Sequence, residues 1–334
     1  MTLILLLAVL AQLAPAPRGA AAGASPVPLV DSVQVAAFGD DRSAFSVHFG
    51  ELTSDYRVMA MFVLPGQRVP IAVDGSVATD DTARYTLDGG SGTAVPNGTA
   101  QWTWTAPVTP GVAPVEVRDS MNGQTMTLNV FVMVPYSAMR RGTLNGYHIG
   151  AYPAPRRGYE SEYQRPLGFV EVTPSVEDVA VSPHFTLGQF MCKQDGDPRY
   201  VVLRQPLLEK LERLLTAANE HGIEAKSFSI MSAYRTPHYN AAIGNKTIFS
   251  RHEYGDAADV FVDEDHDGIM DDLNHDGRHT IADAKVLGAI VNQKEADAPE
   301  FAGLIGGLGT YAPTTGHGPF MHVDVRGFQV EWGS

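Results

Sequence analysis

The sequence predicts two folded regions of different class. Residues 28–135 are expected to form an all-β sandwich of immunoglobulin-like architecture, and residues 183–334 an α+β domain with a small antiparallel sheet. The first region has short β-prone segments separated by turn-forming residues, which is typical of sandwiches. The second has an amphipathic helical stretch followed by short apolar segments. A length of 334 residues is sufficient for two ordinary domains.

The first region predicts its strands through alternation of apolar and polar residues and through β-branched and aromatic content. The segments are residues 32–35, 45–49, 57–63, 101–105 and 126–134. Asp88-Gly-Gly-Ser-Gly and Met121-Asn-Gly are turn signals between them. The pattern holds no catalytic constellation and favours a structural module.

Residues 136–182 contain too many aromatic side chains for a flexible linker and predict an ordered connector. A helix is expected from Pro206 to His221, with apolar residues at helical spacing on one face. Strands are expected over residues 227–233, 257–262 and 320–326.

The formal net charge of −14 argues against a nucleic-acid partner, because phosphate binding needs clustered Lys and Arg. Half of this charge lies in residues 263–283, which hold eight acidic side chains and one Arg. Residues 1–24 resemble an export signal: the apolar run over residues 3–14 is too short to span a bilayer, and small residues follow it. We therefore expect an exported protein, in the periplasm or the extracellular envelope, with no membrane span after cleavage. The single cysteine, Cys192, excludes an internal disulfide.

Three residues have the composition of a catalytic zinc site. His252, Asp259 seven positions later and the distant His322 supply two imidazoles and a carboxylate. Catalytic zinc sites use three protein ligands and leave the fourth position to water. Asp259 and His322 lie in expected strands, which are a rigid base for ligands.

These residues stand in a recognisable frame. Ser250-x-His252-x-x-Gly255-x-Ala257-x-Asp259, the upstream segment Ser232-Ala-Tyr-Arg-Thr-Pro and the later Phe320-Met-His-Val-Asp-Val resemble the motifs of the zinc D-Ala-D-Ala carboxypeptidases and VanX-type dipeptidases. The resemblance covers residues 183–334. It implies a zinc peptidase domain in which His252, Asp259 and His322 bind one catalytic zinc ion.

The resemblance also implies roles for the neighbouring residues. Arg235 is expected to bind the scissile carbonyl or the developing oxyanion, since a fixed guanidinium stabilises negative charge. Ser250 either hydrogen-bonds substrate or shapes the turn. Gly255 is expected to supply a backbone conformation that a side chain would forbid.

One departure concerns the general base. Many members of the family place an acidic residue or a histidine three positions before the last ligand, where this chain has Pro319. The remaining candidates are His317 and Asp324, and Asp324 is equally suited to orienting a ligand histidine. Glu253, beside a ligand, is expected to be solvated.

The acidic segment contains two overlapping calcium-loop patterns with carboxylates at alternate positions and glycine at the sixth. The expected ligands are Asp263, Asp265, Asp267, Asp271, Asp272, Asn274, Asp276, Thr280 and Asp283. The second loop resembles the dockerin type and precedes a helix expected over residues 282–291. We expect one or two structural calcium ions, with His266, His275 and His279 as exposed loop residues.

Together these features predict an exported zinc metallopeptidase that cleaves peptide bonds in peptidoglycan stems or cross-links. The first region would provide spacing or wall binding. Two alternatives stay open: a non-catalytic wall-binding protein that keeps the zinc fold, and a calcium-dependent adhesion module. Carboxypeptidase and endopeptidase action are not distinguished by the sequence.

Overall fold

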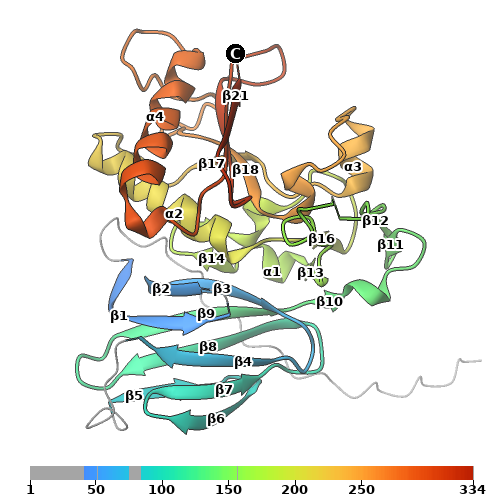
Figure 1. The fold of residues 1–334 in the computed structure, drawn as a ribbon, viewed down its shortest axis with the longest axis vertical. Coiled ribbons are helices and arrows are strands. Elements are labelled where there is room, and N and C mark those ends of the chain that lie inside the picture. Colours follow the sequence, from blue (N-terminus) through green and yellow to red (C-terminus); the bar gives the residue numbers. More distant parts are fainter. Residues whose placement is uncertain (1–40, 51, 75–83, 156, 334) are drawn as a thin grey trace, which may run out of the picture. The chain divides into compact units, whose positions relative to one another are not determined.

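The computed structural model describes residues 41–50, 52–74, 84–155 and 157–333. The described part is rich in β-strands, with four α-helices (Figure 1). The expected export signal and the strand expected at residues 32–35 lie outside the described residues.

The N-terminal region consists of two sheets. The first has the strand order β2-β1-β4-β7-β6 and the second the order β3-β9-β8-β5. Their bounds are Arg42–Phe49 (β1), Leu52–Tyr56 (β2), Val58–Val63 (β3), Arg68–Val73 (β4), Tyr85–Asp88 (β5), Thr93–Gly98 (β6), Gln101–Thr105 (β7), Gly111–Asp119 (β8) and Thr125–Val132 (β9). The strands expected at 45–49, 57–63, 101–105 and 126–134 are confirmed to within a few residues.

Alternation along these strands places one face in the core. In β1, Phe45, Val47 and Phe49 are buried, whereas His48 between them is exposed. Trp104 is fully buried, and its Nε1 donates to the carbonyl of Gly89 at 2.9 Å. A side chain at Gly92 would lie 2.4 Å from the Trp104 ring, so the glycine is required for this packing.

Short elements lie in the expected connector, residues 136–182, and in the segments on either side of it. Their bounds are Val134–Pro135 (β10), Thr143–Leu144 (β11), Tyr147–His148 (β12), Gly168–Val172 (β13), Pro174–Glu177 (α1), Ala180–Ser182 (β14), Phe185–Thr186 (β15) and Arg199–Val201 (β16), with 3-10 turns at Tyr136–Ala138 (η2) and Leu187–Phe190 (η3). β13 pairs with β10 and β16. Tyr152 from this segment is hydrogen-bonded to Tyr234 and to the carbonyl of Glu253, which ties it to the region of the metal candidates.

The C-terminal region contains a sheet with the order β17-β18-β20-β19-β21 and two long helices. Its elements are Gln205–Glu220 (α2), Ser229–Ser232 (β17), Pro237–Ala242 (α3), Arg251–Tyr254 (η4), Ala257–Phe261 (β18), Ile281–Asp297 (α4), Pro299–Phe301 (η5), Gly307–Tyr311 (β19), Phe320–Asp324 (β20) and Val330–Gly333 (β21). All pairings are antiparallel except that of β19 with β21, which is parallel. The expected helices and the three expected strands are confirmed.

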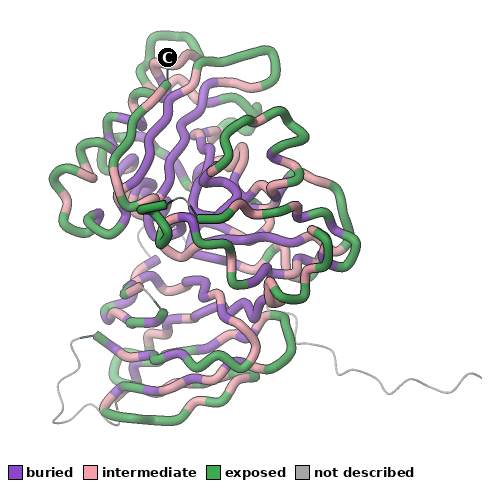
Figure 2. Tube along the Cα trace, turned by 45° about the vertical axis from the view of Figure 1, so that its right-hand side comes forward, coloured by how far each residue is buried: buried purple, intermediate pink, exposed green. Residues whose placement is uncertain are grey.

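The buried face of α4, which includes Leu287, Ile290 and Val291, covers this sheet. Leu207, Leu208, Leu211 and Leu215 of α2 are fully buried. α4 packs against α2, β19 and β20, and the centre of the sheet is buried (Figure 2). β20, the strand that carries His322, is therefore supported by a packed helix.

Candidate metal centre

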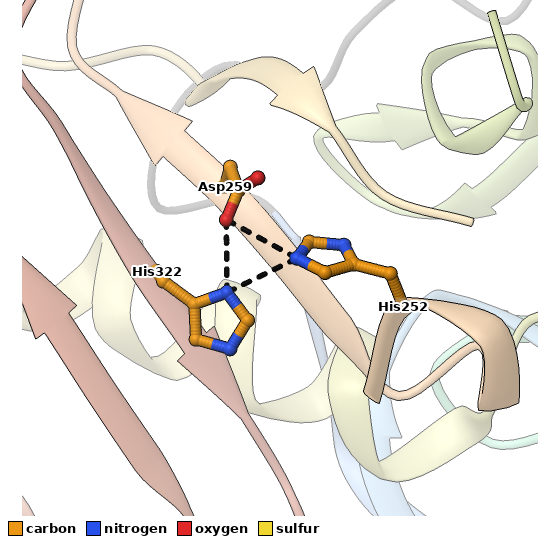
Figure 3. Close-up of side chains that lie close together, drawn as sticks. All are labelled: His252, Asp259 and His322. Carbon is orange, nitrogen blue, oxygen red and sulfur yellow. Dashed lines mark hydrogen bonds and ion pairs between the residues drawn. The ribbon is translucent and has the colours of Figure 1, made fainter. Parts of the chain in front are cut away.

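Strand register brings the three metal candidates together. Asp259 on β18 pairs directly with His322 on β20, so their side chains lie on the same face of the sheet. His252 on η4 reaches the same point (Figure 3). The Oδ1 atom of Asp259 lies 2.8 Å from Nδ1 of His322 and 3.3 Å from Nε2 of His252, and these two nitrogens are 3.2 Å apart. All three side chains are buried.

The outer ring nitrogens have partners that fix their protons. His252 donates from Nδ1 to the carbonyl of Ala233 at 2.7 Å, which leaves Nε2 with its lone pair. His322 places Nε2 3.2 Å from Oδ2 of Asp324, so Nδ1 is the nitrogen turned toward Asp259. When both rings are neutral, two nitrogen lone pairs and a carboxylate oxygen thus converge in a buried space, an arrangement that a cation between them stabilises. Burial lowers the pKa of His322, but Asp259 and Asp324 outweigh it and the net shift is upward, so metal binding would release a proton from this ring. The donor set fits zinc.

Electrostatics agree with an ionised Asp259. Burial opposes its negative charge, but His252 and His322 outweigh burial and lower its pKa well below the usual range. Burial lowers the pKa of His252, so its imidazole is held in the neutral form that metals bind.

Arg235 lies beside the three metal candidates His252, Asp259 and His322, which we call the triad. Its Nη2 donates to Oδ2 of Asp259 at 2.6 Å and its Nε donates to Oγ of Ser232 at 2.8 Å. Its backbone N–H donates to the carbonyl of His252 at 3.1 Å. The guanidinium is therefore fixed next to one ligand, as a group that binds developing negative charge should be.

A cleft of about 690 Å³ begins at Arg235. Ser229–Ser232, Phe261, Met270 and residues 316–319 contribute to its lining. His317 is half-buried in this lining, and its Nδ1 donates to the carbonyl of Gly318 at 2.7 Å. Its Nε2 is therefore left as a proton acceptor.

Asp324 has a different position from His317. It is fully buried, it faces Nε2 of His322, and it accepts from the N–H of Gly307 at 2.8 Å and from Arg326 Nε at 2.9 Å. It contacts the ring nitrogen of His322 that points away from Asp259. Of the two roles that the sequence left open for Asp324, this geometry favours orienting the ligand histidine.

The turn before β18 is fixed by a backbone hydrogen bond and by a glycine. Ser250 is buried, and its carbonyl accepts the N–H of Glu253 at 3.0 Å, which is a turn-shaping contact. Gly255 has φ +70°, and a side chain there would lie 2.4 Å from the carbonyl of Val202. The expected role of Gly255 is confirmed.

The expectation that Glu253 is solvated was wrong. Only 5% of its surface is exposed, and its Oε1 accepts from Nδ2 of Asn240 at 2.7 Å. Burial raises the pKa of Glu253 to about 7. No local pattern around Glu253 predicts this burial, because its hydrogen-bond partner comes from α3.

An aromatic pair beside the triad was not predicted from the sequence. The Trp332 ring lies 5.1 Å from the His322 ring between centroids, and its Nε1 donates to Oη of Tyr311 at 2.6 Å. The pKa of Tyr311 is raised, mainly by burial. The charge of Asp259 also raises it, whereas the hydrogen bond from Trp332 and the charge of Arg235 lower it. No short motif marks these residues; only the pairing of β19 with β21 brings them to the site.

The acidic segment has the same backbone bonding in both expected calcium loops. Asp263 accepts from the N–H groups of Asp267 and Gly268, and Asp272 accepts from those of Asp276 and Gly277. Asp263, Asp265 and Asp267 offer oxygens within 4.8 Å of one another. His266, His275 and His279 are exposed, as expected.

The end of the second loop has a further role. Thr280 caps α4 by accepting from the N–H of Ala282, and Asp283 accepts from the N–H groups of Thr280, Leu273 and Asn274. Together they form a capping box. The buried Asp283 therefore joins the loop to the helix that supports the sheet, whereas the sequence suggested only a calcium ligand. Asp271, at the end of the first loop, accepts from the N–H of Glu264 at 3.1 Å.

A second buried cluster consists of Asp41, His184 and Glu212. His184 Nδ1 lies 2.7 Å from Oε2 of Glu212, and the backbone N–H of His184 donates to Oε1 at 2.9 Å. Burial lowers the pKa of His184, but Glu212 and Asp41 outweigh it, so the net shift is upward.

Comparisons with protein-family models, with curated proteins and with solved structures found no match to this chain. Among the described residues, no helix is long and apolar enough to cross a membrane. The function is therefore inferred from the geometry of the site.

Proposed function

We propose that the protein is an exported zinc metallopeptidase that hydrolyses peptide bonds in peptidoglycan stem peptides or cross-links, with an immunoglobulin-like sandwich preceding the peptidase domain. The convergence of two histidine lone pairs and the Asp259 carboxylate at one buried point carries this proposal. The adjoining cleft and the fixed guanidinium of Arg235 support a hydrolytic role over a purely structural one.

The residues divide the work as follows. His252, Asp259 and His322 would hold zinc, which when bound supplies a water of lowered pKa and a Lewis acid for a carbonyl oxygen. Arg235 binds the carbonyl oxygen as negative charge develops on it. His317 accepts a proton through its Nε2 at the cleft, and Asp324 keeps His322 in the correct orientation.

Digestion of purified sacculi tests the proposal. With zinc present, the wild type should release or shorten muropeptides, His252→Ala should not, and the matched His48→Ala variant should behave as the wild type because His48 is exposed on β1. Zinc content by mass spectrometry is measured on the same samples. A wild-type muropeptide profile equal to that of buffer would refute the peptidase proposal.

The second candidate is a non-catalytic wall-binding protein, which Pro319 favours because it stands where the resembling peptidases have a base. A protein with this function would bind zinc and co-sediment with sacculi without altering them. His317→Ala separates the two candidates: it should lower the hydrolysis rate about 10²-fold if His317 carries the proton, and should leave wall binding unchanged if no reaction occurs.

We also propose structural calcium in the loops at residues 263–283, from the repeated bonding of Asp263 and Asp272 and the link from Asp283 to α4. Calcium at about 100 times its dissociation constant would stabilise the fold by about 2.7 kcal/mol. Thermal unfolding of chelator-treated protein with and without millimolar calcium tests this. An unchanged melting temperature would refute it.

A further inference from the structure

The metal candidates form part of a row of paired residues across the C-terminal sheet. The row runs through Ser232, Asp259, His322, Gly309 and Trp332. Paired residues lie on the same face of a sheet, so the row places Arg235, bonded to Ser232 and Asp259, at one side of the ligands. Trp332 lies at the other side, against His322.

Gly309 makes room for this arrangement. A side chain at Gly309 would lie 2.7 Å from Nε1 of Trp332 and 3.0 Å from Cε2 of Tyr311. The absence of a side chain therefore lets the indole and the phenol meet directly beside the paired His322. Tyr311 is two residues from Gly309 and lies on the same face of the sheet.

The hydrogen bond between the two rings has a fixed direction. An indole N–H only donates, so Oη of Tyr311 is the acceptor in the 2.6 Å contact. The phenolic proton is then available to a second partner, because within the described part of the chain this oxygen is hydrogen-bonded only to Trp332. The Tyr311 ring is stacked on Phe320, with centroids 4.5 Å apart and planes 10° apart.

We propose that Tyr311 is a catalytic residue that donates its O–H to an oxygen of the substrate held at the metal, and that Trp332 is the positioning residue that orients this donor. The identity of the oxygen, a peptide carbonyl becoming an oxyanion, rests on the proposed function. Arg235 and Tyr311 then contact this oxygen from the two sides of the triad. A neutral donor adds stabilisation without adding charge. That Asp259 and Arg235 act on the pKa of Tyr311 agrees with this proximity.

Binding of inorganic phosphate, a tetrahedral oxyanion, to the zinc-loaded protein tests the proposal without requiring any particular substrate. Titration calorimetry should give about tenfold weaker zinc-dependent binding for Tyr311→Phe than for the wild type, because a hydrogen bond to a charged group is lost. Trp332→Phe keeps the ring against His322 but loses the N–H, and should weaken binding about threefold. The double variant should be no weaker than Tyr311→Phe, since Trp332 acts only through Tyr311.

Zinc content and melting temperature should be unchanged in Tyr311→Phe, and Tyr159→Phe at an exposed tyrosine is the matched control. Equal zinc-dependent phosphate affinity in the wild type and Tyr311→Phe, including none in either, would overturn the proposal. Additive losses in the double variant would overturn the role of Trp332. Muropeptide release by the wild type is assayed separately: its failure with phosphate results as expected would refute the peptidase proposal and leave the Tyr311 donor supported.

Discussion

Two buried clusters in this protein are built from the same residue types and differ in how the imidazoles are used. They are His252, Asp259 and His322 in one place, and Asp41, His184 and Glu212 in the other. In the first, both histidines have a partner on the outer nitrogen and turn the inner nitrogen to a common point. In the second, Glu212 accepts from both the ring and the backbone of one histidine.

The contrast shows that composition and burial alone do not define a metal site. Glu212 and His184 satisfy each other, which is the arrangement of an ion pair, and the pKa of His184 is raised accordingly after burial is outweighed. The pKa of His252 is lowered by burial, and its Nε2 faces another nitrogen at 3.2 Å. In the first cluster two imidazole nitrogens meet the same carboxylate oxygen of Asp259, so one carboxylate is shared between two rings and a cation is the natural common partner. In the second cluster a single imidazole is paired with its own carboxylate, Glu212, and needs no cation.

The strongest way to break this comparison is to measure zinc affinity. The zinc affinity of His252→Ala should be at least about 10³-fold lower than that of the wild type, because a zinc-binding free energy of roughly 10–16 kcal/mol is shared among few ligands. His184→Gln should bind zinc as the wild type does. Competition with a chromophoric chelator gives both values. Weakened zinc binding in His184→Gln at full folding would mean that the second cluster is also a metal site.

The free energy of unfolding should depend on the second cluster, whereas zinc binding should not. Glu212→Gln removes one partner of a pair whose side chains are each 1% exposed and should lower the free energy of unfolding by about 3 kcal/mol. Urea unfolding measures this. Glu220→Gln, at an exposed position of the same helix, is the control and should cost less than about 1 kcal/mol. Equal losses in both variants would contradict the ion-pair interpretation.

A smaller effect on zinc affinity is expected at Asp324, which contacts the outer ring nitrogen of His322. Asp324→Asn keeps the shape but weakens the bond to His322 and the pairing with Arg326, and should lower zinc affinity about 10–100-fold. The same chelator competition measures it, and Asp297→Asn at the exposed end of α4 is the control. If Asp324 were the base, activity would fall with zinc affinity unchanged.

The features that could be predicted from the sequence are those specified by residues close together in the chain. α2 was expected from Pro206 to His221 and is found at Gln205–Glu220, because a helix is specified by apolar spacing within its own segment. The three metal candidates were found because the motif is local around η4 and β18 and because a strand carries the last ligand. The capping box of Thr280 was also present locally but was interpreted only as part of a calcium loop.

What the sequence did not predict depends on contacts between distant segments. Trp332 reaches His322 only through the parallel pairing of β21 with β19, and neither short strand has a distinctive pattern. Glu253 is buried and accepts a hydrogen bond from Asn240 of α3. Register and cover of this kind are set by tertiary packing and not by local propensity.

The two clusters should also respond to pH in opposite directions. The pKa of His184 is raised in the folded protein above its ordinary 6.5, so its contribution to stability is complete below that value and is lost as pH rises through the folded-state pKa. The stability difference between wild type and His184→Gln, measured by urea unfolding from about pH 5.5 to 9, should therefore shrink with rising pH, with Glu212 and Asp41 as the charges that hold the proton. The zinc site must lose its metal as pH falls, because imidazoles bind metal only when unprotonated. A difference that grows with rising pH would show that His184 is neutral in the folded protein, and the ion-pair interpretation of the second cluster would be lost.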